Sequence, residues 1–293
     1  MKFFSAKILT TAAASLVFTA AGSSAVFAQG VAFITDIKGD ATLGTVRAAI
    51  MAEVGKGARI SCLNACQVGV MYLLSGKEFT LNGPGDFVVG DADVAAKIGA
   101  PPKLRDTHWK ITAQTVNQAS QTSNASIRMR SIGDAGSAKP EEAVSASRLL
   151  YPLGTAVVSM QPTFRWTATS ARVPYDFELK TAAAPDKPVY KAKSREPSLK
   201  LPASVKLQAD TEYWWSVKSA NTEIGNSTFK TLSTQALALA QTRKPADKAE
   251  FSDWLMYGLT LREVGASQDA SGVFGKLAKD RPDLPELARL AQP

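Results

Sequence analysis

The chain has 293 residues, of which 45% are hydrophobic, and carries a formal net charge of +8 at pH 7. This length predicts two or three domains rather than one. The positive charge favours anionic surfaces by long-range attraction. No cluster of Lys and Arg is interleaved with base-stacking aromatic residues, however, and this argues against nucleic-acid binding.

The first 28 residues are typical of a secretory signal peptide. Lys2 and Lys7 form a basic start, residues 8–28 carry no charge, and small residues lead to Ala28. The alternative is an uncleaved membrane anchor, but Thr and Ser interrupt the apolar stretch. No later segment approaches the roughly 20 apolar residues that span a bilayer. We therefore expect a periplasmic or secreted protein, cleaved near Ala28 and without a transmembrane span in its mature chain.

Residues 29–91 are predicted to form a small antiparallel β-sandwich or barrel. Short runs of alternating apolar and polar residues, the first from Val31 to Lys38, are separated by turn signals. These signals are Gly39-Asp40, Gly55-Lys56-Gly57, Ser75-Gly76-Lys77 and Asn82-Gly83-Pro84-Gly85-Asp86. The last one lacks the GxGxxG spacing of a phosphate loop, so we interpret its glycines as turn formers.

The only two cysteines, Cys62 and Cys66, lie in the segment ISCLNACQV. In an exported chain two cysteines usually pair. Alternating residues on both sides of Leu63-Asn64-Ala65 predict a β-hairpin whose adjacent strands a disulfide bridges. A zinc site normally needs four ligands, and CxxxC differs from the CxxC of thioredoxin-type redox motifs. A structural disulfide is favoured, with a redox pair and a metal site as alternatives.

The pattern of residues 31–91 resembles that of a FecR-type domain. The segments VAFITDIKGDATL and VGKGARISCLNACQVGVMYLLSGKEFTLNGPGDFVV follow the family's series of glycines and alternating apolar residues. The positions in step are Ile37, Gly39, Gly57, Ile60, Gly76, Leu81 and Gly83 to Gly85. The resemblance implies an extracytoplasmic β-rich module, known in iron-siderophore signalling and in other envelope proteins. A transmembrane anti-sigma role is not expected once the signal peptide is cleaved.

Residues 92–150 are predicted to be a linker with short ordered pieces at Asp93–Ile98 and Ser126–Met129. The middle of this stretch is rich in Gln, Ser, Thr and Asn. His108 is the only histidine of the chain, and no nucleophile or acid partner lies near it in the sequence. A surface position is therefore expected for it rather than a catalytic role.

Residues 151–232 resume the strand pattern and resemble a fibronectin type III-like or Ig-like module. The resemblance rests on LLYPLGTAVVSMQPTFRW, LPASVKLQADTEYWWSVKS and GNSTFKTL, and on the Leu207 to Tyr213 spacing before the penultimate strands. Alternation places Tyr213 and Trp215 in a sandwich core and Trp214 on the opposite face. Trp214 is therefore a candidate interaction residue.

Residues 233–293 are predicted to form a helical tail. Apolar residues recur at helical spacing in Thr234–Thr242, Ala246–Val264, Ser267–Lys279 and Leu284–Leu290. The relative spacing of one tetratricopeptide unit is found at Trp254, Gly258, Leu261, Ala270, Phe274 and Pro282. This resemblance implies a helical hairpin in which Gly258 faces Ala270 or its neighbours. One unit cannot bury its own faces, so we expect it to cap the neighbouring domain, to pair with Thr234–Thr242, or to dock on a partner through Trp254 and Tyr257.

These patterns predict a mainly β fold with a C-terminal α-helical segment and no catalytic activity. The sequence has no GxSxG, SxxK or HExxH motif and no cluster of metal ligands, so no metal or cofactor is expected. The predicted function is that of an exported interaction, scaffold or regulatory protein of the cell envelope, with an envelope protein as partner. The alternative is a glycan or peptidoglycan binder, which an exposed aromatic residue and the basic middle segments favour.

Overall fold

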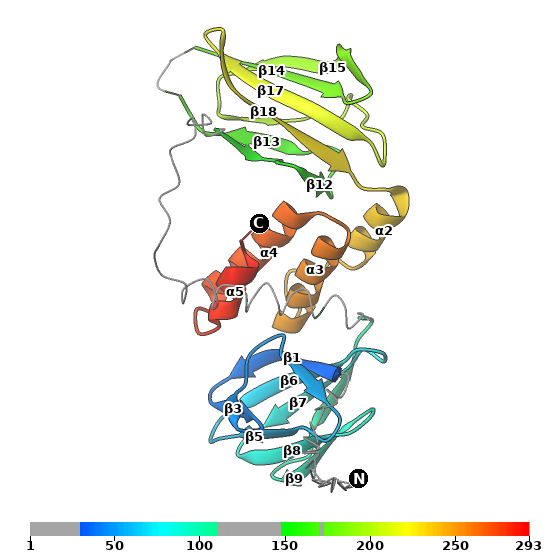
Figure 1. The fold of residues 1–293 in the computed structure, drawn as a ribbon, viewed down its shortest axis with the longest axis vertical. Helices are drawn as coiled ribbons and strands as arrows, with labels where there is room; N and C mark the ends of the chain where they lie inside the picture. The colour runs from blue at the N-terminus through cyan, green and yellow to red at the C-terminus, as the bar shows by residue number, and fades with distance from the viewer. Residues whose placement is uncertain (1–29, 110–115, 117–147, 170–172, 293) are drawn as a thin grey trace, which may run out of the picture.

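The computed structural model describes residues 30–109, 116, 148–169 and 173–292. The predicted signal peptide and the expected piece at Ser126–Met129 lie outside these residues. None of the helices among the described residues is both long enough and apolar enough to cross a membrane. As predicted, the fold is mainly β with a C-terminal helical segment, and Figure 1 shows the helices between two β domains.

The first β domain, residues 30–109, consists of two five-stranded antiparallel sheets. One sheet has the order β10-β7-β6-β1-β4 and the other β3-β2-β5-β8-β9. The strands are β1 (Gly30–Lys38), β2 (Ala41–Leu43), β3 (Val46–Arg47), β4 (Glu53–Gly55), β5 (Arg59–Cys62), β6 (Gln67–Tyr72), β7 (Lys77–Asn82), β8 (Gly85–Val89), β9 (Val94–Ile98) and β10 (Lys103–Asp106). Buried side chains such as Val70, Ile60 and Phe87 fill the space between the sheets.

The predicted disulfide is present, but the predicted hairpin around it is wrong. Cys62 and Cys66 are bonded with their Cα atoms 5.4 Å apart, and both are almost fully buried. β5 pairs with β2 and β8, whereas β6 pairs with β1 and β7, so the loop carries the chain from one sheet to the other. In the chain-entropy model the closure of so short a loop contributes about 2 kcal/mol.

Three such crossings between the sheets meet at one corner, and glycines allow them to pack. A Cβ on Gly39, between β1 and β2, would lie 3.2 Å from the Cα of Cys66. A Cβ on Gly83, between β7 and β8, would lie 2.6 Å from the carbonyl oxygen of Asn64. Gly39 also has φ +79°, which favours glycine. The glycines predicted as turn formers are therefore also spacers between neighbouring turns.

The first β domain extends beyond the boundary at residue 91 that the sequence suggested. β9 pairs with β8, and β10 pairs with β7, at the edges of the two sheets. Trp109, which follows β10, is 1% exposed. The linker prediction was drawn from the polar and small-residue stretches at 114–126 and 133–142, and the ordered piece expected at Asp93–Ile98 is the edge strand β9.

The second sandwich, residues 149–231, packs a three-stranded sheet against a five-stranded sheet. The orders are β11-β13-β16 and β12-β18-β17-β14-β15. The strands are β11 (Leu149–Tyr151), β12 (Thr155–Val157), β13 (Thr163–Trp166), β14 (Tyr175–Thr181), β15 (Ala184–Ser194), β16 (Ser198–Lys200), β17 (Glu212–Ser219) and β18 (Thr222–Thr231). Two sheets packed face to face form a β-sandwich, and the fibronectin/Ig-like resemblance of this sandwich stays a prediction.

An aromatic cluster forms the core of the second sandwich. Phe164 contacts three other rings, with its centroid 4.7 Å from that of Phe177 and 5.0 Å from that of Trp215. The hydroxyl oxygen of Tyr213 accepts a hydrogen bond from the backbone N–H of Gln208, 2.8 Å away. This bond fixes the corner before β17, which the Leu207 to Tyr213 spacing predicted, and the buried hydroxyl group keeps a partner.

The helical segment, residues 234–290, contains α2 (Thr234–Thr242), α3 (Phe251–Glu263), α4 (Ser267–Asp280) and α5 (Pro285–Leu290). Ser233 caps α2 by accepting a hydrogen bond from the N–H of Ala236. Only three residues separate α3 from α4, so the two helices form an antiparallel hairpin. α3 begins five residues later than the sequence suggested, because residues 246–250 form turns instead.

Gly258 lies against the ring of Phe274, and this contact holds the hairpin together. A Cβ on Gly258 would lie 2.6 Å from a ring carbon of Phe274, which is itself 0% exposed. The sequence predicted that Gly258 faces Ala270 or a neighbour. Ala270 is buried, but the residue that leaves no room for a side chain at 258 is Phe274, one turn further along α4. Leu261 is also buried, whereas Pro282 is exposed beyond the end of α4.

The hydrophobic core of the helical segment is continuous with that of the first β domain. Leu255, Leu259 and Phe274 belong to the same buried cluster as Phe33 and Val70, while the second sandwich has a core of its own. The tail was expected to cap the 151–232 domain, to pair with α2 or to dock on a partner. It does contact α2, whose Ala240 belongs to this cluster, and β12 of the second sandwich, but its buried core is shared with the first β domain, which the sequence did not suggest.

Substitutions at the Gly258–Phe274 contact test its role in stability. Gly258→Leu should overpack it and lower the free energy of unfolding by about 1–3 kcal/mol. Phe274→Ala should leave a cavity that costs about 3–5 kcal/mol. Chemical denaturation would measure both. As a control, Gly272→Leu on the open side of α4 should not destabilise the protein, because no atom lies within 4 Å of a Cβ there. Equal losses at Gly258 and Gly272 would contradict the assignment.

Candidate functional site

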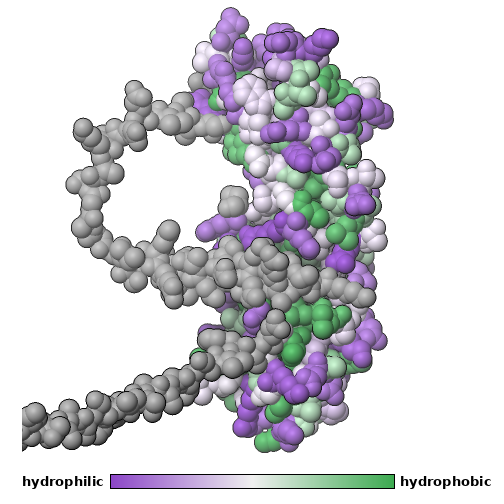
Figure 2. All heavy atoms as spheres, turned by 45° about the vertical axis from the view of Figure 1, so that its right-hand side comes forward, coloured by the Kyte–Doolittle hydropathy of each residue, from purple (hydrophilic) through white to green (hydrophobic). Residues whose placement is uncertain are grey.

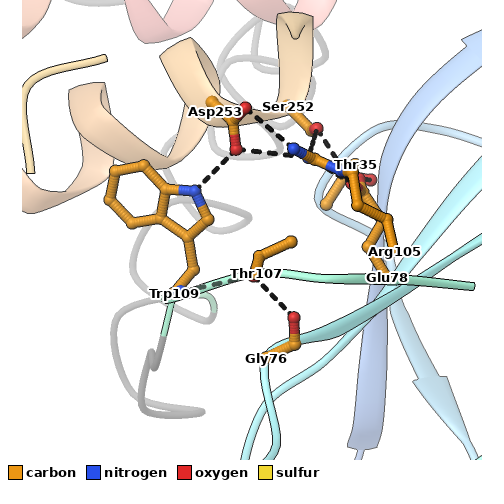
Figure 3. Close-up of polar contacts among 8 residues, drawn as sticks. All are labelled: Thr35, Gly76, Glu78, Arg105, Thr107, Trp109, Ser252 and Asp253. Carbon is orange, nitrogen blue, oxygen red and sulfur yellow. Dashed lines mark hydrogen bonds and ion pairs between the residues drawn. The ribbon is translucent and has the colours of Figure 1, made fainter. Parts of the chain in front are cut away.

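The carboxylate of Glu78 is the centre of a polar network that joins the first β domain to α3 (Figure 3). Glu78 lies on β7 and is 5% exposed. It accepts hydrogen bonds from the hydroxyl of Thr35 at 2.6 Å, from Nε of Arg105 at 2.9 Å and from the hydroxyl of Ser252 at 3.1 Å. Gly69 leaves room for the Thr35 hydroxyl, which a Cβ would approach to 2.6 Å.

Asp253, in the first turn of α3, extends this network (Figure 3). Its Oδ2 pairs with Nη1 of Arg105 at 2.9 Å, and its Oδ1 accepts a hydrogen bond from the indole N–H of Trp109 at 2.8 Å. A carboxylate in the first turn also interacts favourably with the helix dipole. Arg105 therefore bridges two acidic groups, which raises its pKa against the opposing effect of burial.

Arg281, just after α4, also holds the helical segment against the first β domain. We call the ionic contacts of Arg105 and Arg281 the two arginine clamps. Its guanidinium pairs with Asp36 of β1 at 2.6 Å and with Asp283 at 2.8 Å, and it also donates to the carbonyl of Ile37. It stacks over the ring of Phe251, 5.2 Å from the centroid. The side chain is only 16% exposed, so these ionic contacts are weakly screened by solvent.

The loop between α3 and α4 completes the edge of the second sandwich. The N–H of Ala156 on β12 donates to the carbonyl of Gly265 at 3.0 Å, and the hydroxyl of Thr155 donates to the same oxygen at 3.2 Å. The side chain of Gln268 accepts from the N–H of Leu153 at 2.7 Å. An edge strand that would otherwise expose unpaired backbone groups is covered in this way.

Asp269, in the first turn of α4, is held by two donors from the second sandwich. Its Oδ1 accepts from the hydroxyl of Tyr151 at 2.9 Å, and its Oδ2 accepts from the N–H of Val158 at 3.2 Å. Burial raises the pKa of Asp269 against the effect of these bonds. Burial, followed by the nearby charge of Asp269, raises the pKa of Tyr151 as well.

Of the three residues proposed for interaction, one is buried and another is partly buried. Tyr257 is 6% exposed, and Trp254 is partly buried against the same core. Their rings meet edge to face at 6.0 Å. The tetratricopeptide-like spacing was used to propose both residues, but helical periodicity alone does not distinguish a face that binds a partner from one covered by the same chain.

Trp214 is the exception, because it is 45% exposed on the outer face of the five-stranded sheet. This face, which we call the Trp214 face, is formed by alternate residues of four strands. Its members are Asp176, Glu178 and Lys180 on β14, Lys191 and Lys193 on β15, Trp214, Ser216 and Lys218 on β17, and Asn226 and Thr228 on β18. Hydrophilic side chains cover much of the sandwich end of the molecule in Figure 2.

Charges on the Trp214 face are largely paired. Glu178 lies 2.7 Å from Lys191 and 3.2 Å from Lys180, and these partners lower its pKa. A depression of about 510 Å³ lies on the Trp214 face and is lined by Glu178, Ser216 and Lys218 among others, although Trp214 itself does not line it. Lys218, two same-face positions along β17 from Trp214, forms no ion pair with the described residues.

Groups that carry catalytic or metal chemistry are sparse among the described residues. No set of three or more His, Cys, Asp or Glu side chains is arranged to hold a metal ion in that part of the chain. His108 is exposed, and its ring lies 4.6 Å from that of Trp109. The polar networks described above join the β domains to the helical segment through their own contacts. The sequence patterns did not indicate Glu78, Arg105 and Asp253, because their partners are far away in the chain.

Comparison with known proteins adds no assignment. No family model matches the chain, and no curated protein matches it. The FecR-type resemblance of the first β domain therefore stays a prediction.

Removal of the Arg105 charge should weaken the contact between the first β domain and α3. Arg105→Gln leaves Glu78 buried without its cation, and breaking a buried pair typically costs about 3–5 kcal/mol. Because the Arg105 side chain is 36% exposed, we expect a smaller loss of about 2–4 kcal/mol in the free energy of unfolding. Chemical denaturation would measure it.

The matched control is Lys56→Gln, which removes the exposed Lys56–Asp91 pair and should leave stability unchanged. Replacing both charges, Glu78→Gln with Arg105→Gln, should recover part of the loss because no buried charge remains. An Arg105→Gln protein as stable as the control would show that the network contributes nothing.

Asp269→Asn should stabilise the protein near neutral pH and lose this advantage in acid. The raised pKa means that Asp269 supports the native fold fully only below its unfolded pKa of about 3.9, and that this support is lost as the pH rises through the folded pKa. Asn has nearly the same size as Asp. Its side-chain oxygen can accept a hydrogen bond from the N–H of Val158, and its NH₂ group can donate one to the hydroxyl oxygen of Tyr151. Melting temperatures of both proteins between about pH 3 and pH 7 would test this; a constant difference would contradict it.

Proposed function

We propose that this chain is a non-catalytic exported protein that binds an envelope protein partner through the Trp214 face of its second sandwich. In this proposal the FecR-type domain and the helical segment hold that face in position. The two arginine clamps and the β12 edge contacts support the proposal, because they join both β domains to one helical segment. A surface held on such a support loses little conformational freedom when it binds.

The observation that carries the proposal is the exposure of Trp214. An indole on the solvent face of a central strand contributes nothing to the sandwich core, and tryptophan is enriched among residues that dominate the energy of protein interfaces. Paired lysines and carboxylates surround it and provide the polar rim that such interfaces usually have.

The alternative is a glycan, such as peptidoglycan, as the ligand of the same face. A specific observation favours it: the same face carries a depression lined by Asp176, Ser216 and Lys218. A flat aromatic ring beside hydrogen-bonding groups suits a sugar, which has an apolar ring face and polar edges. A protein partner would be captured by crosslinking, whereas a peptidoglycan ligand would carry this protein into the insoluble fraction, so the two ligands can be told apart.

Site-specific photocrosslinking should decide between them. We expect a photoreactive residue in place of Asn226, which faces Ser216 across β17 and β18, to capture a discrete protein in intact cells. Trp214→Ala in the same chain should abolish this product, because the largest apolar contact is lost. A photoreactive residue in place of the exposed Lys97 on the first β domain is the matched control and should capture nothing at that mass.

Sedimentation with insoluble peptidoglycan supplies the contrasting result. Co-sedimentation that Trp214→Ala abolishes, without any protein crosslink at 226, would replace the proposal with the glycan alternative. Crosslinks and sedimentation that are both unaffected by Trp214→Ala would refute a role of this face in either interaction. Melting curves of Trp214→Ala should match those of the native chain, since the side chain lies outside the core.

A further inference from the structure

A cleft lies where the three-stranded sheet of the second sandwich meets α4. Its volume is about 530 Å³, within the usual range for small-molecule pockets. The walls come from two parts of the chain that are more than a hundred residues apart. Tyr151, Gln161, Thr163 and Arg165 line it from the sandwich, and Gly272 and Lys276 line it from α4. It is separate from the Trp214 face, which belongs to the other sheet.

The unengaged polar groups of this cleft are hydrogen-bond donors. Arg165 stacks over the ring of Tyr151 at 5.3 Å, but neither it nor Lys276 forms an ion pair with the described residues. The single acid that lines the cleft, Asp269, already accepts hydrogen bonds at both oxygens. Two cations without ion pairs therefore face a cleft whose one lining carboxylate is held by other donors, although the charge of Arg165 is close enough to interact with it.

Gly272 keeps the α4 side of the cleft open. Glycine within a helix costs about 1 kcal/mol relative to alanine, and no packing contact explains it here, since a Cβ would meet no atom within 4 Å. Gly258 of α3 differs in this respect, because the ring of Phe274 fills the space beside it. The glycine at 272 thus preserves empty space beside Lys276, one helical turn away.

We propose that this cleft binds a small ligand through an oxyanion, a carboxylate or phosphate group held by Arg165 and Lys276. The planar guanidinium of Arg165 can pair with two oxygens of such a group at once. Lys276 supplies a second charge from the opposite wall, and Gln161 and Thr163 offer hydrogen bonds to neutral parts of the ligand.

Calorimetric titration of the purified protein with inorganic phosphate and with succinate would test the site. We expect saturable binding of at least one probe. Binding of phosphate alone would indicate a phosphate ligand, and binding of succinate alone would indicate a carboxylate ligand. Arg165→Gln and Lys276→Gln should each weaken it about tenfold, the loss of one charge-assisted hydrogen bond. Gly272→Phe should abolish binding by filling the cleft, whereas Gly272→Ala should retain it.

Lys218→Gln is the matched control, because it removes the same charge from the Trp214 face without touching the cleft. The Lys218→Gln protein should bind the phosphate or succinate probe with the same affinity as the native protein. Equal weakening by Lys218→Gln and Lys276→Gln would show nonspecific attraction and overturn the proposal. So would the absence of saturable binding of both probes, or binding that survives Gly272→Phe in a protein with a native melting curve.

Discussion

The buried carboxylate of Glu78 constrains much of the structure. An ionised group at 5% exposure is tolerated only when charged and hydrogen-bonding partners surround it. Thr35, Arg105 and Ser252 supply these partners from β1, β10 and α3. The first β domain cannot satisfy Glu78 through its own core strands alone, so β10 and the start of the helical segment are part of its stable form.

This requirement also positions the second sandwich. α3 begins at the Glu78 network and ends two residues before Gly265, whose carbonyl binds β12. A helix of 13 residues is about 20 Å long, so one rigid element connects the two β domains, as Figure 1 shows. Hydrogen bonds to β12 at one end and ionic contacts to β10 at the other fix its orientation along this length.

The sequence patterns predicted features that depend on residues close together in the chain, and they missed features that depend on residues far apart. Alternation identified the strands and the buried ring of Trp215, and the short spacing of Cys62 and Cys66 identified the disulfide. Alternation does not say which strands pair, so the switch of sheets between β5 and β6 was missed. Likewise, Arg105 and Asp253 are separated by 148 residues, and a charged residue carries no local signal of so distant a partner.

The location of the aromatic residues limits how a partner can be recognised. A lone tetratricopeptide-like unit leaves its faces open, but here the β domains cover them and Tyr257 is internal. β12 is covered by the loop at Gly265, so β15 is the open edge of the five-stranded sheet. Pro188 lacks an N–H group there, and Lys191 and Lys193 lie alongside, features that discourage the addition of another strand. In the function proposed above, recognition by this sandwich therefore depends on side chains of the Trp214 face rather than on main-chain pairing at its edge.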